Sequence, residues 1–203
     1  MEHLLRSVEQ AVDQKNWYAA LLIALTLPDV SAKVDGRKGK VGERYVSWAK
    51  EWIEPTYLRE APTKPPAIMR EMYETLRDRT NQNAPRDFMR KMKSLASGPR
   101  VKTCLMTAGD LYALRCAYCH EYSHELENHN AKGILTRFHI SEPPSKGSMH
   151  LNMKDDGCLQ VQVDLFCLEI SEGVRQWLAS RGGTPEVKAS LERISVIKPA
   201  FNF

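Results

Sequence analysis

The chain has 203 residues, enough to bury a hydrophobic core without disulfides or a structural metal, and we expect a single domain over residues 1–203. Hydrophobic residues make up 42% and charged residues 27%, which predicts an ordinary soluble globular protein. The formal net charge of +4 permits an anionic partner such as RNA without requiring one, so charge alone selects no function.

The number of cysteines and the first ten residues indicate the cellular compartment. The five cysteines are an odd number, and residues 1–10 carry an acidic residue at position 2 and no continuous apolar run. The apolar run over residues 19–27 is too short to span a bilayer. We therefore expect a cytoplasmic protein with reduced thiols and no membrane partner.

Three helices are predicted in the first quarter of the chain. Apolar residues recur at helical spacing over residues 4–12 and 17–25, with a break near residues 14–16 and an end before Pro28. Residues 29–42 are rich in Gly and Lys and predict a loop. A third helix is expected over residues 43–54, stopped by Pro55.

Two charged helices are expected next, over residues 67–79 and 85–96. This part of the chain is its most basic: Arg70, Arg77, Arg79, Arg86, Arg90, Lys91, Lys93, Arg100 and Lys102. Interleaved acidic residues favour a solvated face with salt bridges. A surface that follows an RNA backbone is the alternative.

The second half mixes helices with a small β element. Thr107 and Asp110 have capping-box spacing and predict a helix from there to about residue 128. A strand over 134–140, a hairpin around residues 155–157 and helices over about 164–182 and after Thr184 follow. The predicted fold is therefore mostly α, a helical bundle with a small β-hairpin insertion over about 134–163.

Residues 107–124 carry several overlapping motifs. Cys116, Cys119 and His120 spell the CxxCH motif of haem c attachment, but attachment normally follows export, which we do not expect. His120, Glu121 and His124 spell HExxH, the zinc motif of metalloproteases. No third ligand follows at the usual spacing, since that position is Asn130.

A zinc module is a further alternative. Cys116, Cys119, His124 and His129 are spaced like the ligands of a small zinc knuckle. Knuckles need glycines to turn sharply, and none lies between Cys116 and His129. A zinc-binding module that uses Cys116, Cys119 and His124 therefore stays an alternative and not the preferred interpretation.

Arg115 and His120 form the remaining pattern. Five steps of about 100° put them on different faces of a straight helix, so they would converge only through a bend or through a second copy of the chain. An Arg followed after four to six residues by His near a helix end resembles the signature of HEPN-domain ribonucleases. Those are helical bundles that dimerise so that two Arg–His pairs line one RNA-cutting cleft.

Other segments resemble a family of uncharacterised bacterial proteins with an ALRC-x-x-x-HE segment. They are Ala24-Leu-Thr-Leu-Pro-Asp29, Glu43-Arg-Tyr45 with Trp48, Gly109-Asp-Leu-Tyr-Ala-Leu-Arg-Cys116 with His120-Glu121, and Val163-Asp-Leu-Phe-Cys167 with Trp177. The most specific of them is residues 112–121.

The resemblance implies an endoribonuclease without metal or cofactor that forms a homodimer. It also implies a place in bacterial defence or a toxin system, with a regulatory protein as a partner. His120 would transfer protons, Arg115 would bind the scissile phosphate, and Glu121 would either orient His120 or be a surface carboxylate. A non-catalytic helical module that binds a protein or RNA is the alternative from another class.

Overall fold

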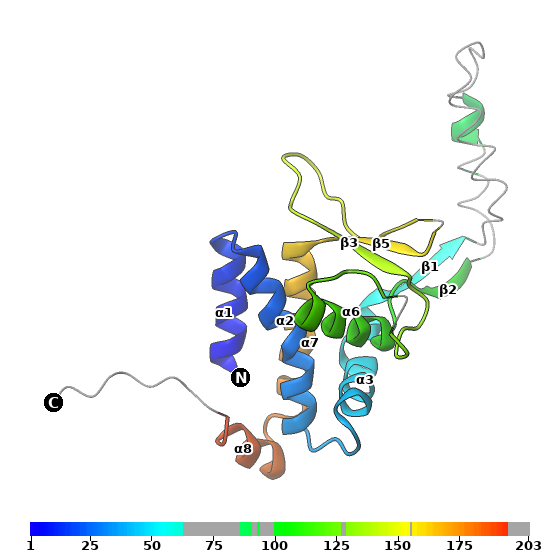
Figure 1. Cartoon of the computed structure of the whole chain (residues 1–203). Coiled ribbons are helices and arrows are strands. Elements are labelled where there is room, and N and C mark those ends of the chain that lie inside the picture. Colours follow the sequence, from blue (N-terminus) through cyan, green and yellow to red (C-terminus); the bar gives the residue numbers. More distant parts are fainter. Residues whose placement is uncertain (63–85, 91–92, 94–99, 127–128, 155, 195–203) are drawn as a thin grey trace. The chain divides into compact units, whose positions relative to one another are not determined.

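The computed structural model describes residues 1–62, 86–90, 93, 100–126, 129–154 and 156–194 (Figure 1). The chain divides into two compact units, a larger one of Met1–Tyr57 with Leu105–Phe203 and a smaller one of Leu58–Cys104. The described chain is mostly helical with a small β-sheet, so the predicted fold class is confirmed. The extent of a single domain over the whole chain stays a prediction.

The larger unit begins with α1 (Glu2–Asp13), α2 (Trp17–Val34) and α3 (Val41–Trp52). The predicted break between the first two helices is confirmed: Lys15 has a φ of +56°, and the Asn16 side chain accepts a hydrogen bond from Ala19 N. A short 3₁₀ helix, η1 (Glu54–Tyr57), follows α3.

The prediction that the second helix ends before Pro28 is wrong. α2 continues through Pro28 to Val34, so the predicted loop at 29–42 shrinks to residues 35–40. Proline removes one backbone donor from a helix interior and crowds the preceding turn. Here Leu25, Leu27 and Ala32 are fully buried on both sides of Pro28, and this burial offsets the lost hydrogen bond.

Helix α2 is the centre of the larger unit. It packs against α1, α3 and α7 (Val163–Arg181), with α1 and α3 on either side of it in Figure 1. The rings of Trp48 on α3 and Trp177 on α7 meet edge to face, with their centroids 5.8 Å apart. By length and composition α2 could cross a membrane, and half of it is buried inside the fold.

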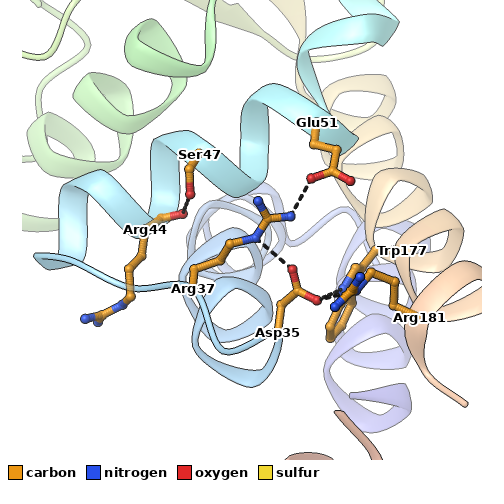
Figure 2. Close-up of polar contacts among 7 residues, drawn as sticks. All are labelled: Asp35, Arg37, Arg44, Ser47, Glu51, Trp177 and Arg181. Carbon is orange, nitrogen blue, oxygen red and sulfur yellow. Dashed lines mark hydrogen bonds and ion pairs between the residues drawn. The ribbon is translucent and has the colours of Figure 1, made fainter. Parts of the chain in front are cut away.

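A buried carboxylate joins the end of α2 to α7. Asp35 is 2% exposed at its side chain and accepts hydrogen bonds from Arg37 Nε (2.7 Å), Arg181 Nε (2.8 Å) and Trp177 Nε1 (3.0 Å) (Figure 2). Arg37 also pairs with Glu51 on α3. Burial opposes the charge of Arg37, but the bonds to the two carboxylates outweigh it and raise the pKa of the guanidinium.

The sheet of the larger unit has three strands in the order β3 (Arg137–Ser141), β5 (Cys158–Gln162) and β4 (Asn152–Met153). β4 and β5 form the predicted antiparallel hairpin, and Gly157 in its turn has a φ of +75°. β3 runs parallel to β5, which leads directly into α7. α8 (Pro185–Leu191) begins after Thr184, as predicted.

In the described part of the smaller unit, β1 (Leu58–Pro62) pairs antiparallel with β2 (Arg100–Cys104), which the sequence did not predict. Residues 86–90 and 93 are helical, within the predicted helix at 85–96. The helix predicted over 67–79 and four of the basic residues lie outside the described residues. Arg90 forms an exposed ion pair with Asp87 at 3.0 Å, as a solvated helix face would.

Candidate functional site

The site begins with the capping box that starts α6 (Ala108–Glu121). The Thr107 hydroxyl accepts a hydrogen bond from Asp110 N at 3.1 Å, and the Asp110 carboxylate accepts one from Thr107 N at 2.9 Å. Glu54 adds a third cap, because its carboxylate accepts from Ala108 N at 2.8 Å. The predicted start of this helix is therefore confirmed.

Asp110 also holds the segment that leads into β3. Its fully buried carboxylate accepts hydrogen bonds from the backbone N–H groups of Gly133 (2.8 Å), Ile134 (3.0 Å) and Leu135 (3.0 Å). These bonds explain why β3 begins at Arg137 and not at 134. A Cβ at position 133 would lie 2.2 Å from the Thr107 hydroxyl, so this approach requires glycine.

The predicted end of α6 near residue 128 is wrong. The helix ends at Glu121, and Tyr122 adopts the left-handed conformation with a φ of +51°. The N–H groups of Tyr122 and Ser123 close the end by donating to the Tyr118 and Ala117 carbonyls. The chain then turns toward β3, where Glu125 forms a β-bridge with Arg137.

This early end changes the HExxH motif. His120 lies in the last turn of α6, whereas His124 lies beyond the helix, so the two do not share one helix face. His124 is exposed and has Glu125 Oε1 at 3.9 Å from its Nε2. The HExxH arrangement on a helix is therefore not formed.

Arg115 and His120 lie together within one copy of the chain. Arg115 Nη1 is 3.3 Å from His120 Nε2, and Arg115 Nη2 donates to Asp29 Oδ2 at 3.3 Å. The Cα–Cβ bonds of the two residues point to different faces of the helix, as five helical steps require. The long arginine side chain nevertheless reaches the imidazole. Since arginine only donates, a hydrogen bond between the two requires a lone pair on His120 Nε2.

Burial differs between the members of this cluster. The side chains of Arg115 and Asp29 are 18% and 26% exposed, whereas His120 is exposed. The guanidinium is thus fixed against α2, and the imidazole at the helix end faces solvent. This arrangement leaves the imidazole accessible to a substrate.

Asp29 is the residue that sequence reasoning missed as a member of the site. It lies 86 positions before Arg115 and falls in the segment expected to be a loop. Asp29 does end one of the segments that resemble the bacterial family, Ala24-Leu-Thr-Leu-Pro-Asp29. Its contact with Arg115 was missed because that contact requires α2 to continue past Pro28.

Two tyrosines lie near the arginine, Tyr45 on α3 and Tyr112 on α6. The rings of Tyr45 and Tyr112 are 5.1 Å apart, and the Tyr45 hydroxyl donates to the Leu25 carbonyl at 3.2 Å. A Cβ at Gly42 would lie 2.9 Å from the Tyr112 ring, so glycine lets α3 begin against α6. Burial raises the pKa of both hydroxyls, which stay protonated near neutral pH.

Charges around the arginine favour its cationic form. Burial opposes this charge, but contact with Cys116 and the nearby Asp29 carboxylate outweigh it and raise the pKa of Arg115. Burial raises the pKa of the Cys119 thiol, and the neighbouring Arg115 only partly offsets it. Cys119 is therefore a protonated thiol at neutral pH, unlike a reactive thiolate.

Cys116 contacts Arg115, whereas Glu121 does not join the cluster. Glu121 is exposed and makes no hydrogen bond or ion pair within the described part of the chain. Cys116 and Cys119 are half-buried free thiols. Among the residues that the structure describes, no group of three or more His, Cys, Asp or Glu side chains is arranged to hold a metal ion.

Comparisons of the chain with protein-family models, with curated proteins and with solved structures find no match.

Proposed function

We propose that the protein is a metal-independent endoribonuclease of HEPN type in which Arg115 and His120 act on one phosphodiester. The observation that carries the proposal is the 3.3 Å contact between Arg115 Nη1 and His120 Nε2 at an exposed helix end. A guanidinium beside an imidazole supplies an anion-binding group and a proton-transfer group for the same substrate.

In the proposed reaction the RNA's own 2′-hydroxyl attacks the adjacent phosphorus. His120 Nε2 takes the proton from that hydroxyl as the 2′-oxygen bonds to phosphorus. The bond from phosphorus to the 5′-oxygen breaks, and this leaving oxygen takes up a proton. The products are a 2′,3′-cyclic phosphate and a free 5′-hydroxyl, and Arg115 stabilises the charge that develops on the phosphoryl oxygens.

Two proton transfers need two groups, and one chain supplies a single histidine beside Arg115. A homodimer would bring a second His120 to protonate the leaving oxygen. Glu121, exposed next to His120, is the predicted residue for orienting the imidazole. Asp29 acts as a positioning residue because its carboxylate fixes Nη2 of Arg115.

The wider proposal places the protein in the cytoplasm, with RNA as substrate. The resemblance to HEPN ribonucleases further suggests bacterial defence or a toxin system, with a regulatory protein that restrains cleavage. These parts rest on the resemblance and not on the geometry of the site.

The test compares purified variants on a single-stranded RNA in the presence of a chelator. His120→Ala should lower the cleavage rate roughly 100-fold or more while leaving RNA affinity nearly intact. Arg115→Ala should lower both, and Arg115→Lys should restore little, because a lysine lacks the planar fork of donors. His129→Ala is the matched control, a histidine close in sequence whose side chain lies outside the Arg115 cluster.

One observation favours a non-catalytic alternative, a helical module that binds a protein or RNA. Arg115 is mostly buried and paired with Asp29, as a structural ion pair between α6 and α2 would be. Under this alternative Arg115→Ala lowers the melting temperature and His120→Ala changes nothing. If folded His120→Ala cleaves as well as the parent, or the parent cleaves no RNA, the ribonuclease proposal is wrong.

A further inference from the structure

A second site is visible in a pocket of about 440 Å³ where α2 begins and α6 ends. Four aromatic side chains line it: Trp17 and Tyr18 from α2, Tyr118 from α6, and Tyr122 directly after α6. Neither Arg115 nor His120 lines it, so the pocket is separate from the cluster proposed to cleave RNA. Its volume falls in the range of pockets that hold small-molecule ligands.

Two of the aromatic side chains are unusually exposed. Tyr18 is 75% and Tyr122 is 80% exposed, although large aromatic residues usually bury most of their surface. The rings of Tyr118 and Tyr122 lie 6.0 Å apart and are tilted by 51°, so they do not stack flat on each other. The exposed ring faces are therefore free to stack on a planar ligand.

The rest of the lining is mixed, with apolar side chains from Leu21, Ile140 and Val163 and polar groups on the side of β3. His124, His139 and Glu142 line it from the segment after α6 and from β3 and its end. An ionised glutamate only accepts hydrogen bonds, whereas a histidine ring can donate one. A planar ligand in this pocket can therefore offer donors to Glu142, acceptors to the histidines and a flat face to the tyrosines.

We propose that this pocket binds a guanine base, stacked on the exposed tyrosines, with Glu142 accepting hydrogen bonds from its N1–H and N2–H₂ groups. Guanine is the base whose pairing edge presents two adjacent donors, which match the two oxygens of a carboxylate. Adenine and cytosine place a ring acceptor beside their amino group, and uracil places carbonyls beside its N3–H. His124 and His139 can donate to O6 or N7 of the same base.

An aromatic pocket with one carboxylate can also hold a quaternary ammonium ion. Such a cation offers no acceptor for the two histidines, and it would be repelled by either of them when protonated. Burial raises the pKa of Tyr118, with smaller contributions from the nearby Tyr18 and Tyr122, so the Tyr118 hydroxyl stays neutral and offers the cation no charge. The polar groups of the lining therefore favour the base over the cation.

The guanine can belong to a free nucleotide or to a single-stranded RNA, and the test separates these sources. Binding of GMP, AMP, CMP and UMP is measured by calorimetry and by quenching of the tryptophan fluorescence, to which Trp17 of the pocket contributes, in the folded full-length protein. A second arm uses 2′-O-methyl hexanucleotides with or without one guanine, which cannot be cleaved because their 2′-hydroxyls are blocked. The inference does not depend on the proposed cleavage, because neither arm measures it.

We expect GMP or the guanine hexanucleotide to bind at least tenfold more tightly than the corresponding ligands without guanine. A preference confined to the hexanucleotide identifies RNA as the source, and an equal preference for GMP identifies a free nucleotide. Equal affinity for all four bases, or no binding in either arm, would overturn the proposal. Tighter binding of choline than of GMP would overturn it in favour of a cation site.

Variants of the pocket residues test which side chains recognise the base and which stack on it. Glu142→Gln should remove the preference for guanine, because the amide turns one acceptor into a donor that faces N–H groups. Tyr18→Ala should weaken all bases about tenfold, since stacking does not distinguish them. Glu172→Gln on α7, also exposed and outside the pocket, is the control and should bind as the parent does. A Glu142→Gln protein that keeps the full guanine preference would show that the carboxylate does not read the base.

Discussion

The anchor of α6 gives the sharpest test of how the fold supports the site. Asp110→Ala removes a fully buried carboxylate that receives hydrogen bonds from Thr107, Gly133, Ile134 and Leu135. A hydrogen bond to a charged group contributes about 1.5–3 kcal/mol. Water can replace the carboxylate at the N–H groups of the exposed Gly133 and Ile134. It cannot do so at the buried Leu135, and it reaches the half-buried Thr107 only in part. Two uncompensated bonds give an expected loss of about 3–6 kcal/mol in unfolding free energy.

The assay is urea unfolding followed by tryptophan fluorescence. The four tryptophans, Trp17, Trp48, Trp52 and Trp177, all lie in the larger unit, so the signal reports on that unit. Linear extrapolation then gives the free energy of unfolding.

The control removes a carboxylate of a different kind. Asp156 is 49% exposed and accepts from Cys158 N and from Arg137 at 2.5 Å, so Asp156→Ala should lose about 1 kcal/mol or less. Asp110→Asn should lie between the two, because its amide keeps one acceptor and points a donor at the Thr107 N–H. If Asp110→Ala loses no more stability than Asp156→Ala, the carboxylate does not anchor the helix and the reasoning fails.

Three further outcomes follow from single positions. Burial raises the pKa of Cys167 to about 12, so its thiol should resist iodoacetamide at pH 8 in the folded protein and react after unfolding. The neutral Cys167 thiol contributes its full stabilisation below the ordinary pKa of 9.0, and this contribution is lost as the pH rises through about 12. Melting curves of Cys167→Ala at high pH should therefore lack this loss of stability. Gly133→Ala should cost about 2 kcal/mol or more in urea unfolding, whereas Gly183→Ala, with open space around it, should change stability by about 0.5 kcal/mol or less. Tyr45→Phe should cost about 1–2 kcal/mol in the same assay, because the buried Leu25 carbonyl loses its donor.

The elements that could be predicted from the sequence have local signals. Thr107 and Asp110 form the capping box that their spacing indicates, and Gly157 turns the predicted hairpin. The two elements that were predicted wrongly depend on distant partners. Pro28 stays inside a helix because both sides of it are buried. Helix α6 ends at Glu121, with Tyr122 and not a glycine in the left-handed conformation, because the following segment pairs with β3. No local pattern carries that information.

In the candidate site, too, the local contact could be predicted from the sequence and the distant one could not. Arg115 and His120 are five residues apart, so one motif contains both, and the structure adds the side-chain reach that backbone angles alone left out. Asp29 comes from another helix, and its contact with Arg115 depends on packing between α2 and α6. A single sequence gives no measure of that packing.

Asp29 and His120 give the guanidinium two different partners, and the difference has a consequence for the proposed reaction. The bond to Asp29 persists whatever the state of the imidazole, because the carboxylate remains an acceptor. The bond to His120 occupies the lone pair on Nε2, so it must break for that nitrogen to take the proton of the 2′-hydroxyl. Proton uptake by His120 therefore frees Nη1 of Arg115 to donate to a phosphoryl oxygen at the moment when negative charge develops there. In this scheme Asp29 keeps the arginine in place while its partner at Nη1 changes from histidine to substrate, so Asp29→Asn should impair cleavage more than it impairs RNA binding.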